Sequence, residues 1–245
     1  MNTFEQISGE FLKILSGLDL NSCNISIDKS DIEDFPSKYD VADGFSEGLA
    51  RVILNGKWGF IDKFGREVIP CKYDNAWKFK DGLAQVCLNR KWGFVDTTGK
   101  EICPCKYDVI EHFKEGLCAV CLNGKWGFLD KTGREVIPCK YDNVWNFREG
   151  LARVQLDWKW GCIDKVGKEI IPAVFDDLSM ISSALIVIKI GCKQGVINHN
   201  GEYILPCQYD EIIVFDKRIV AMKSDTKYVF NLSGDFIKIL NEEYS

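Results

Sequence analysis

Apolar and polar residues alternate over short segments along most of the chain, and turn-forming dipeptides separate these segments. Residues 48–54, "GLARVIL", are followed by Asn55-Gly56, the dipeptide best suited to a two-residue type I′ hairpin turn. Residues 57–62, "KWGFID", are rich in aromatic and β-branched residues and lead to Gly65, where glycine supplies the positive φ of a second tight turn. The segments "EVIPCKYD" and "NAWKF" follow before the pattern starts again. The alternation predicts antiparallel units of four short strands, and no unit has the apolar spacing of a helix.

The pattern returns at a fixed interval, which predicts an array of tandem repeats. Successive lysines of the "KWGFID" column lie 34 residues apart, and the column comprises Lys57, Lys91, Lys125, Lys159, Lys193 and Lys227. An aromatic column with the same spacing comprises Tyr39, Tyr73, Tyr107, Tyr141, Phe175 and Tyr209, and an aspartate follows each member. We therefore expect an all-β fold of six 34-residue antiparallel units over residues 37–245, without insertions or deletions between these landmarks.

Residues 1–36 have a different pattern, which indicates an N-terminal cap on the array. Phe4, Ile7, Phe11, Leu12, Leu15 and Leu18 recur at helical spacing, so one short amphipathic helix is predicted. The segment "CNISID" is a candidate for a short strand. A cap is expected because the terminal apolar face of a stacked unit must be covered.

Two architectures accommodate six such units. Four short strands per unit are typical of a propeller blade, so a closed β-propeller-like ring is the favoured interpretation. The alternative is an open β-superhelix, or solenoid, in which each unit contacts only its neighbours. A proline column lies in the third strand of each unit, which indicates that this strand is an outer edge, and it comprises Pro70, Pro104, Pro138, Pro172 and Pro206.

The repeated phrase "EGLAxVxLNGKWGFIDKxGxEVIPCKYD" resembles the WG repeat family, named for its Trp-Gly pair. The pair stands at Trp58-Gly59, Trp92-Gly93, Trp126-Gly127 and Trp160-Gly161, whereas Gln194-Gly195 keeps only the glycine and Tyr228-Val229 keeps neither residue. The resemblance covers about five-sixths of the chain. It implies a tandem repeat scaffold of a largely bacterial family and no particular reaction.

Composition and charge narrow the classes of function. The chain has 245 residues, of which 46% are hydrophobic, and its longest apolar runs are too short to cross a bilayer, so we expect a soluble globular protein. Eleven cysteines without a secretory signal favour reduced thiols and a cytoplasmic location. A net charge of −5 argues against nucleic acid and anionic membranes as partners.

Most recurring residues have a structural explanation. The tryptophans Trp58, Trp92, Trp126 and Trp160 are expected to hold the units together, and the adjoining glycine permits close approach of a neighbouring backbone. Tyr73, Tyr107 and Tyr141 are likewise interpreted as structural repeat residues. For the lysine and aspartate columns, we expect either an ion pair between units or an aspartate that bonds its own turn backbone.

The cysteines and histidines do not predict a metal site, a cofactor or an enzyme. Cys118 and Cys121 lie three apart in a predicted strand and should point to opposite faces. Cys103 and Cys105 should share one face, yet no second pair or nearby histidine completes a tetrahedral site. His112 and His199 are the only histidines, and neither lies in a local motif with a nucleophile.

Positions that the repeat does not dictate are the better candidates for function. One column reads Asp43, Trp77, Glu111, Trp145, Ser179 and Ile213, beside an apolar column that should face the core. Trp77 and Trp145 are therefore expected to be exposed, as is Trp158, which stands where other copies have Asn-Gly. These three tryptophans and His112 are the candidate partner-binding residues.

The leading hypothesis is a non-catalytic repeat scaffold that binds a protein or peptide through these variable positions. The alternative is binding of a small molecule or glycan at one shallow aromatic site per repeat, and an enzyme is a more distant third.

Overall fold

The computed structural model describes residues 38–181 and 185–240, and these residues form 24 β-strands with no helix among them. The strands make six four-stranded antiparallel sheets, each formed by four consecutive strands. The chain divides into two compact units, Met1–Tyr107 and Asp108–Ser245. The all-β fold with six tandem units is thereby confirmed, whereas the helix and strand expected within residues 1–36 lie outside the described residues. The choice between a ring and a superhelix stays a prediction.

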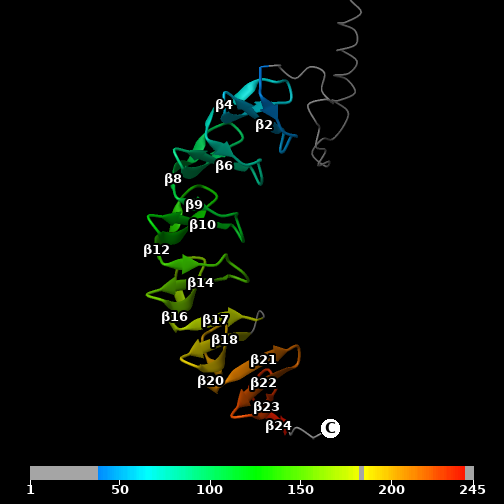
Figure 1. The fold of residues 1–245 in the computed structure, drawn as a ribbon, viewed down its shortest axis with the longest axis vertical. Helices are drawn as coiled ribbons and strands as arrows, with labels where there is room; N and C mark the ends of the chain where they lie inside the picture. The colour runs from blue at the N-terminus through cyan, green and yellow to red at the C-terminus, as the bar shows by residue number, and fades with distance from the viewer. Residues whose placement is uncertain (1–37, 182–184, 241–245) are drawn as a thin grey trace, which may run out of the picture. The chain divides into compact units, whose positions relative to one another are not determined.

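Unit 1 contains the first two sheets (Figure 1). Sheet 1 comprises β1 (Val41–Ala42), β2 (Leu49–Leu54), β3 (Lys57–Asp62) and β4 (Glu67–Tyr73). Sheet 2 comprises β5 (Asn75–Ala76), β6 (Leu83–Leu88), β7 (Lys91–Asp96) and β8 (Glu101–Tyr107).

Unit 2 contains the other four sheets. Sheet 3 comprises β9 (Val109–Ile110), β10 (Leu117–Leu122), β11 (Lys125–Asp130) and β12 (Glu135–Tyr141). Sheet 4 comprises β13 (Asn143–Val144), β14 (Leu151–Leu156), β15 (Lys159–Asp164) and β16 (Glu169–Phe175). Sheet 5 comprises β17 (Asp177–Met180), β18 (Leu185–Ile190), β19 (Lys193–Asn198) and β20 (Tyr203–Tyr209). Sheet 6 comprises β21 (Glu211–Phe215), β22 (Arg218–Lys223), β23 (Thr226–Phe230) and β24 (Phe236–Leu240).

Apolar side chains from adjacent sheets meet face to face and form the cores. In unit 1, Phe60 of sheet 1 packs edge-on against Phe79, which belongs to the second repeat, with ring centres 4.8 Å apart. In unit 2, Phe128 and Phe147 repeat this contact at the same 4.8 Å. Since full burial of one such side chain contributes roughly 1.5–3 kcal/mol, the contact between sheets supplies much of the stability of each repeat.

The glycine of each Trp-Gly pair lies beneath an irregularity in the edge strand. In sheet 3, Trp126 pairs with Tyr141 and Phe128 pairs with Ile137, so one residue of β11 faces three residues of β12. The bulged strand presses on Gly127, where a Cβ atom would lie only 2.4 Å from the Ile137 carbonyl oxygen. The expected close approach of backbone to this glycine is confirmed, and it explains why alanine does not replace glycine here.

In four of the six Tyr-Asp or Phe-Asp pairs, the aspartate bonds groups of two successive sheets. In unit 2, Asp142 accepts a hydrogen bond from Lys125 of sheet 3 through Oδ1 and one from the Asp157 backbone N–H of sheet 4 through Oδ2. Asp74, Asp176 and Asp210 make the same pair of contacts with a lysine 17 residues earlier and a hairpin-turn amide. The expected ion pair between the lysine and aspartate columns is therefore confirmed. The expected bond of the aspartate to its own turn is wrong, because the bonded amide lies in the hairpin turn of the following sheet, 15 residues later for Asp142.

The sixth repeat is one residue shorter than the others, which corrects the expected spacing. The turn amide bonded by the aspartate lies 15 residues after Asp176, at Gly191, but only 14 residues after Asp210, at Ser224. Thr226 consequently occupies the lysine position, Lys227 the tryptophan position and Tyr228 the glycine position. Tyr228 is tolerated there because β24 pairs with it in regular register, without the bulge found in the other five sheets.

Two positions on the outer face of sheet 6, which points away from sheet 5, carry charged side chains where the preceding sheets have apolar ones, whereas Val229 on the same face is apolar and buried. Arg218 is exposed at the position of Leu49 and Leu185, both of which are buried. Lys238 pairs with Val229 just as Ile69 pairs with Phe60, and it is exposed whereas Ile69 is buried.

We predict that Gly127→Ala destabilises the protein because the added methyl group forces β12 away from β11. The expected loss is about 1–3 kcal/mol in the free energy of unfolding, measured by urea titration. The matched control is Gly124→Asn, which places a side chain in open space at a φ of 76° that asparagine tolerates. Equal losses for the two variants would contradict the close-approach explanation.

We also predict a pH-dependent contribution from Asp142, whose pKa is lowered from its ordinary value of 3.8, chiefly by the hydrogen bond from Lys125. A carboxylate with a lowered folded-state pKa stabilises the protein above its unfolded-state pKa and loses that effect as the pH falls through the folded-state pKa. The difference in melting temperature between wild type and Asp142→Asn should therefore be full at pH 7 and should shrink below about pH 4. Glu169→Gln, at the exposed start of β16, serves as the control. A difference independent of pH would refute the assignment.

Candidate interaction surface

The described residues contain neither a metal centre nor a helix long and apolar enough to cross a membrane. No group of three or more His, Cys, Asp or Glu side chains in residues 38–181 and 185–240 could hold a metal ion. Burial raises the pKa of the Cys105 thiol to about 11 and that of the Cys162 thiol to about 12, so both are neutral and poor nucleophiles. These cysteines are packing residues.

The expectation that Cys103 and Cys105 share one face is wrong. Ile69 and Cys71, at the corresponding positions of sheet 1, point in opposite directions: Ile69 lies in the core toward sheet 2, whereas Cys71 packs on the other face of sheet 1. Cys105 in turn packs toward sheet 1. The bulge in the edge strand breaks the simple alternation on which the expectation depended.

The four candidate partner-binding residues all lie on the surface. Trp77 is 51% exposed, Trp145 is 59% exposed and Trp158 is 85% exposed, and His112 is also exposed. The neighbouring Ala76 is buried and Val144 is half-buried, so the two columns face opposite sides as expected. Trp77 belongs to unit 1, whereas the other three residues belong to unit 2.

The tryptophans of the Trp-Gly pairs are half-buried. Trp58, Trp126 and Trp160 each pack against a core formed with the following sheet, and Trp92 is similarly half-buried. The tyrosines Tyr73, Tyr107 and Tyr141 are buried. These tryptophans and tyrosines pack the sheets that carry the exposed positions.

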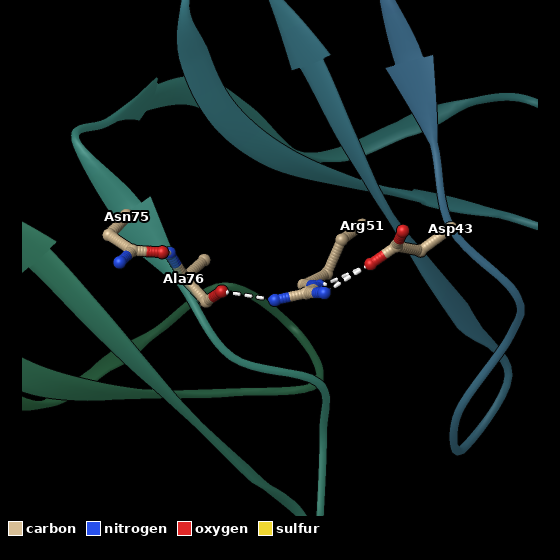
Figure 2. A network of polar contacts seen from close by, with 4 residues as sticks. All are labelled: Asp43, Arg51, Asn75 and Ala76. Atoms are coloured by element: carbon tan, nitrogen blue, oxygen red, sulfur yellow. Dashed lines mark hydrogen bonds and ion pairs between the residues drawn. The ribbon is translucent and has the colours of Figure 1, made fainter.

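In unit 1, Arg51 bridges the two sheets by hydrogen bonds to Asp43 and to the Ala76 carbonyl oxygen (Figure 2). The Arg51 guanidinium carbon lies 4.7 Å from the centre of the Trp58 ring. Its Nε and Nη2 atoms both donate to Asp43 Oδ2, and its Nη1 donates to the Ala76 carbonyl oxygen of sheet 2 at 2.5 Å. Every nitrogen of this guanidinium therefore has an acceptor.

In unit 2, Arg153 occupies the same position in sheet 4 but has different partners. It stacks on Trp160 at 4.6 Å and on Trp145 at 5.4 Å, measured from its guanidinium carbon to each ring centre. Nη2 donates to Asp177 Oδ1 of sheet 5 at 3.1 Å, but Nε is buried without an acceptor. Burial lowers the pKa of Arg153, although Asp177 opposes this effect. Trp145 stands where sheet 1 has Asp43, so the carboxylate that completes the first site is missing from the second.

Sequence reasoning identified Trp145 but missed Arg51 and Arg153. The signal was present: the motif "LARV" occurs only in the first and fourth repeats, and the arginine stands eight residues after the variable position. Because Trp145 donates its backbone N–H to the Arg153 carbonyl oxygen, the two side chains are cross-strand neighbours. Pairing the variable columns across strands would have found this cluster, which we call the Trp145–Arg153–Trp160 stack.

Comparison with known proteins identifies a family through its repeat model. The model of the WG containing repeat matches residues 35–58, 58–92, 92–126, 126–160, 160–193 and 195–225. No curated protein matches the sequence.

Several solved structures are similar at low sequence identity. A eukaryotic initiation factor has a TM-score of 0.41 and 10% identity, and the match covers 85% of this chain and 67% of that one. Hsv2 of Kluyvelomyces marxianus has a TM-score of 0.36 and 8% identity, with coverage of 81% and 72%. The WD40 beta propeller domain of Doa1 has a TM-score of 0.28 and 11% identity, with coverage of 86% and 81%. Because these TM-scores lie below 0.5, the assignment rests on the match to the repeat model, and the chain belongs to the WG containing repeat family.

Proposed function

We propose that the protein is a non-catalytic, cytoplasmic scaffold that binds a protein or peptide through exposed tryptophans held on its rigid sheets. The observation that carries the proposal is the exposure of Trp145 and Trp158 in sheet 4. Trp158 stands where other repeats have small or polar residues, whereas the position of Trp145 varies from Asp43 to Trp77 among the repeats. Large exposed aromatic side chains are the residue type most enriched among binding hot spots.

The backbone at Trp158 supports a functional role for this residue. Trp158 lies in the β14–β15 turn with a φ of 65°, where the corresponding residues Gly56 and Gly124 are glycines with φ of 73° and 76°. A bulky residue in the left-handed region costs about 1–2 kcal/mol relative to glycine. With 85% of its surface exposed, Trp158 recovers little of that cost through packing. Strain at an exposed aromatic favours a role in recognition.

The uneven distribution of tryptophans favours a protein or peptide over a repeated glycan or small-molecule site. One aromatic site per repeat would require an aromatic residue at every variable position, yet Asp43, Glu111 and Ser179 stand at three of them. The side chains therefore form individual contact points, as a protein partner requires. The net charge of −5 disfavours nucleic acid as that partner.

A peptide library selected on the wild-type protein should yield ligands whose binding depends on sheet 4. We expect Trp145→Ala to weaken those ligands by about 10- to 100-fold, the usual range for a hot-spot residue, as measured by calorimetry. Trp77→Ala tests the candidate in unit 1 in the same way. Val166→Ala, at an exposed position in the β15–β16 turn, is the control and should leave affinity unchanged. Unchanged affinity in both tryptophan variants would overturn the proposal, and binding of glycans but no peptides would favour the alternative.

Trp158→Gly should separate stability from binding. Glycine relieves the positive φ, so the free energy of unfolding in urea should rise by up to about 1 kcal/mol while peptide affinity falls. Arg90→Gly is the matched control because Arg90 holds the same turn position in sheet 2 with a φ of 62°. That variant should gain similar stability and keep full affinity. If both variants keep full affinity, Trp158 is not a contact residue.

A further inference from the structure

We propose that Arg153 anchors a carboxylate of the bound peptide, with Trp145 packing on the apolar residue beside it. This inference rests on the proposed function and names the chemistry of its ligand: an acidic side chain or a C-terminal carboxylate next to an apolar side chain.

In sheet 1 of the same chain, the corresponding arginine already has a carboxylate bound to it. In sheet 1, the Asp43 carboxylate accepts from Nε and Nη2 of Arg51, whose guanidinium stacks on Trp58. The Nε and Nη2 N–H groups lie along one edge of the guanidinium, and this edge matches the geometry of a carboxylate. Charge-assisted hydrogen bonds of this kind are stronger than neutral ones.

Sheet 4 has the corresponding guanidinium, on Arg153, and the tryptophan on which it stacks. It has no carboxylate at the position of Asp43. Arg153 stacks on Trp160 almost as Arg51 stacks on Trp58, at 4.6 and 4.7 Å. Its side chain is only 15% exposed, and its Nε atom is buried with no acceptor. An unpaired buried N–H of a charged group is unfavourable, so an external acceptor that reaches it gains this lost hydrogen bond.

Trp145 is placed to admit such an acceptor. Its indole covers the guanidinium at 5.4 Å, yet 59% of its surface is exposed, and exposed side chains change rotamer within nanoseconds. In the proposed binding mode, the ring turns aside to open Nε to the surface, and an apolar side chain of the peptide packs against the displaced ring.

Asp177 does not fill the site. Neither of its carboxylate oxygens accepts from Nε. Its Oδ1 atom accepts from Arg153 Nη2 at 3.1 Å and also from the Leu178 backbone N–H. The Asp177 side chain is 56% exposed, so water screens its charge. A second carboxylate on the Nε side is therefore compatible with the ion pair already present.

The test uses the full chain and peptides selected from the library described above. Each acidic residue of a selected peptide is replaced by its amide, and the C-terminus is prepared as both acid and amide, which separates the two sources of carboxylate. We expect one replacement to weaken binding by about tenfold or more. In the protein, Arg153→Gln, which installs the residue found at this position in sheet 2 as Gln85, should cause a similar loss and abolish the difference between acid and amide. Arg51→Gln in unit 1 should leave affinity unchanged.

Trp145→Asp provides a second test that does not depend on removing Arg153. The new aspartate recreates the arrangement of Asp43 and Arg51, so it should occupy the same edge of the Arg153 guanidinium and abolish the preference for acidic peptides. The ¹⁵N–¹H signal of Arg153 Nε should shift when the acidic peptide is added to wild type, and it should not shift in Trp145→Asp.

The outcomes separate this inference from the proposed function. If Trp145→Ala weakens binding while Arg153→Gln and the amide peptides bind as before, the scaffold binds peptides but the carboxylate anchor is wrong. If acid and amide peptides shift the Arg153 signal equally, the acceptor is a neutral carbonyl and the inference is likewise overturned. If neither the variants of sheet 4 nor Trp77→Ala changes affinity, the proposed function fails as well.

Discussion

Each sheet of this protein is too small to bury its own apolar faces, and this constraint determines the rest of the structure. A four-stranded sheet with strands of two to seven residues has a core only when another sheet covers it. The next repeat provides this cover through the contacts between Phe60 and Phe79 and between Phe128 and Phe147. The aspartates that hold a lysine of one sheet and a turn amide of the next fix the spacing at which the faces meet.

The same constraint explains which parts of the molecule could be predicted from sequence. Strand order, turns and the role of the Trp-Gly glycine could be predicted from local pattern. Repeats with the same pattern of residues pack in the same way, so each copy supports the prediction made for the others. The shortened sixth repeat was hidden because Lys227 stands 34 residues after Lys193 by coincidence, whereas hydrogen bonding places Thr226 at that position. The face of Cys105 could not be predicted either, since a bulge changes side-chain direction without a distinct residue signature.

The candidate site was only half visible in the sequence for a related reason. Exposure of Trp145 follows from the column in which it stands, but its relation to Arg153 depends on cross-strand pairing. Because the Arg153 guanidinium bridges sheets 4 and 5, it contributes to the packing of the sheets as well as to the candidate site. The peptide binding that we propose for Arg153 therefore depends on the same contact that joins sheet 4 to sheet 5. The repeated residues determine how the sheets are arranged, and the residues that differ between repeats form the candidate site.

The two charged side chains on the outer face of sheet 6 bear on how such a chain can grow over evolutionary time. Tandem duplication copies a unit together with both of its faces. A copy appended after sheet 6 would have to stack its apolar face on Arg218 and Lys238, two charges that lose their hydration on burial. A copy inserted among the preceding units meets the leucine and isoleucine faces that it already fits. The desolvation of Arg218 and Lys238 therefore sets an energetic cost on stacking a further apolar sheet against this face, a cost that the leucine and isoleucine faces of the preceding sheets do not impose.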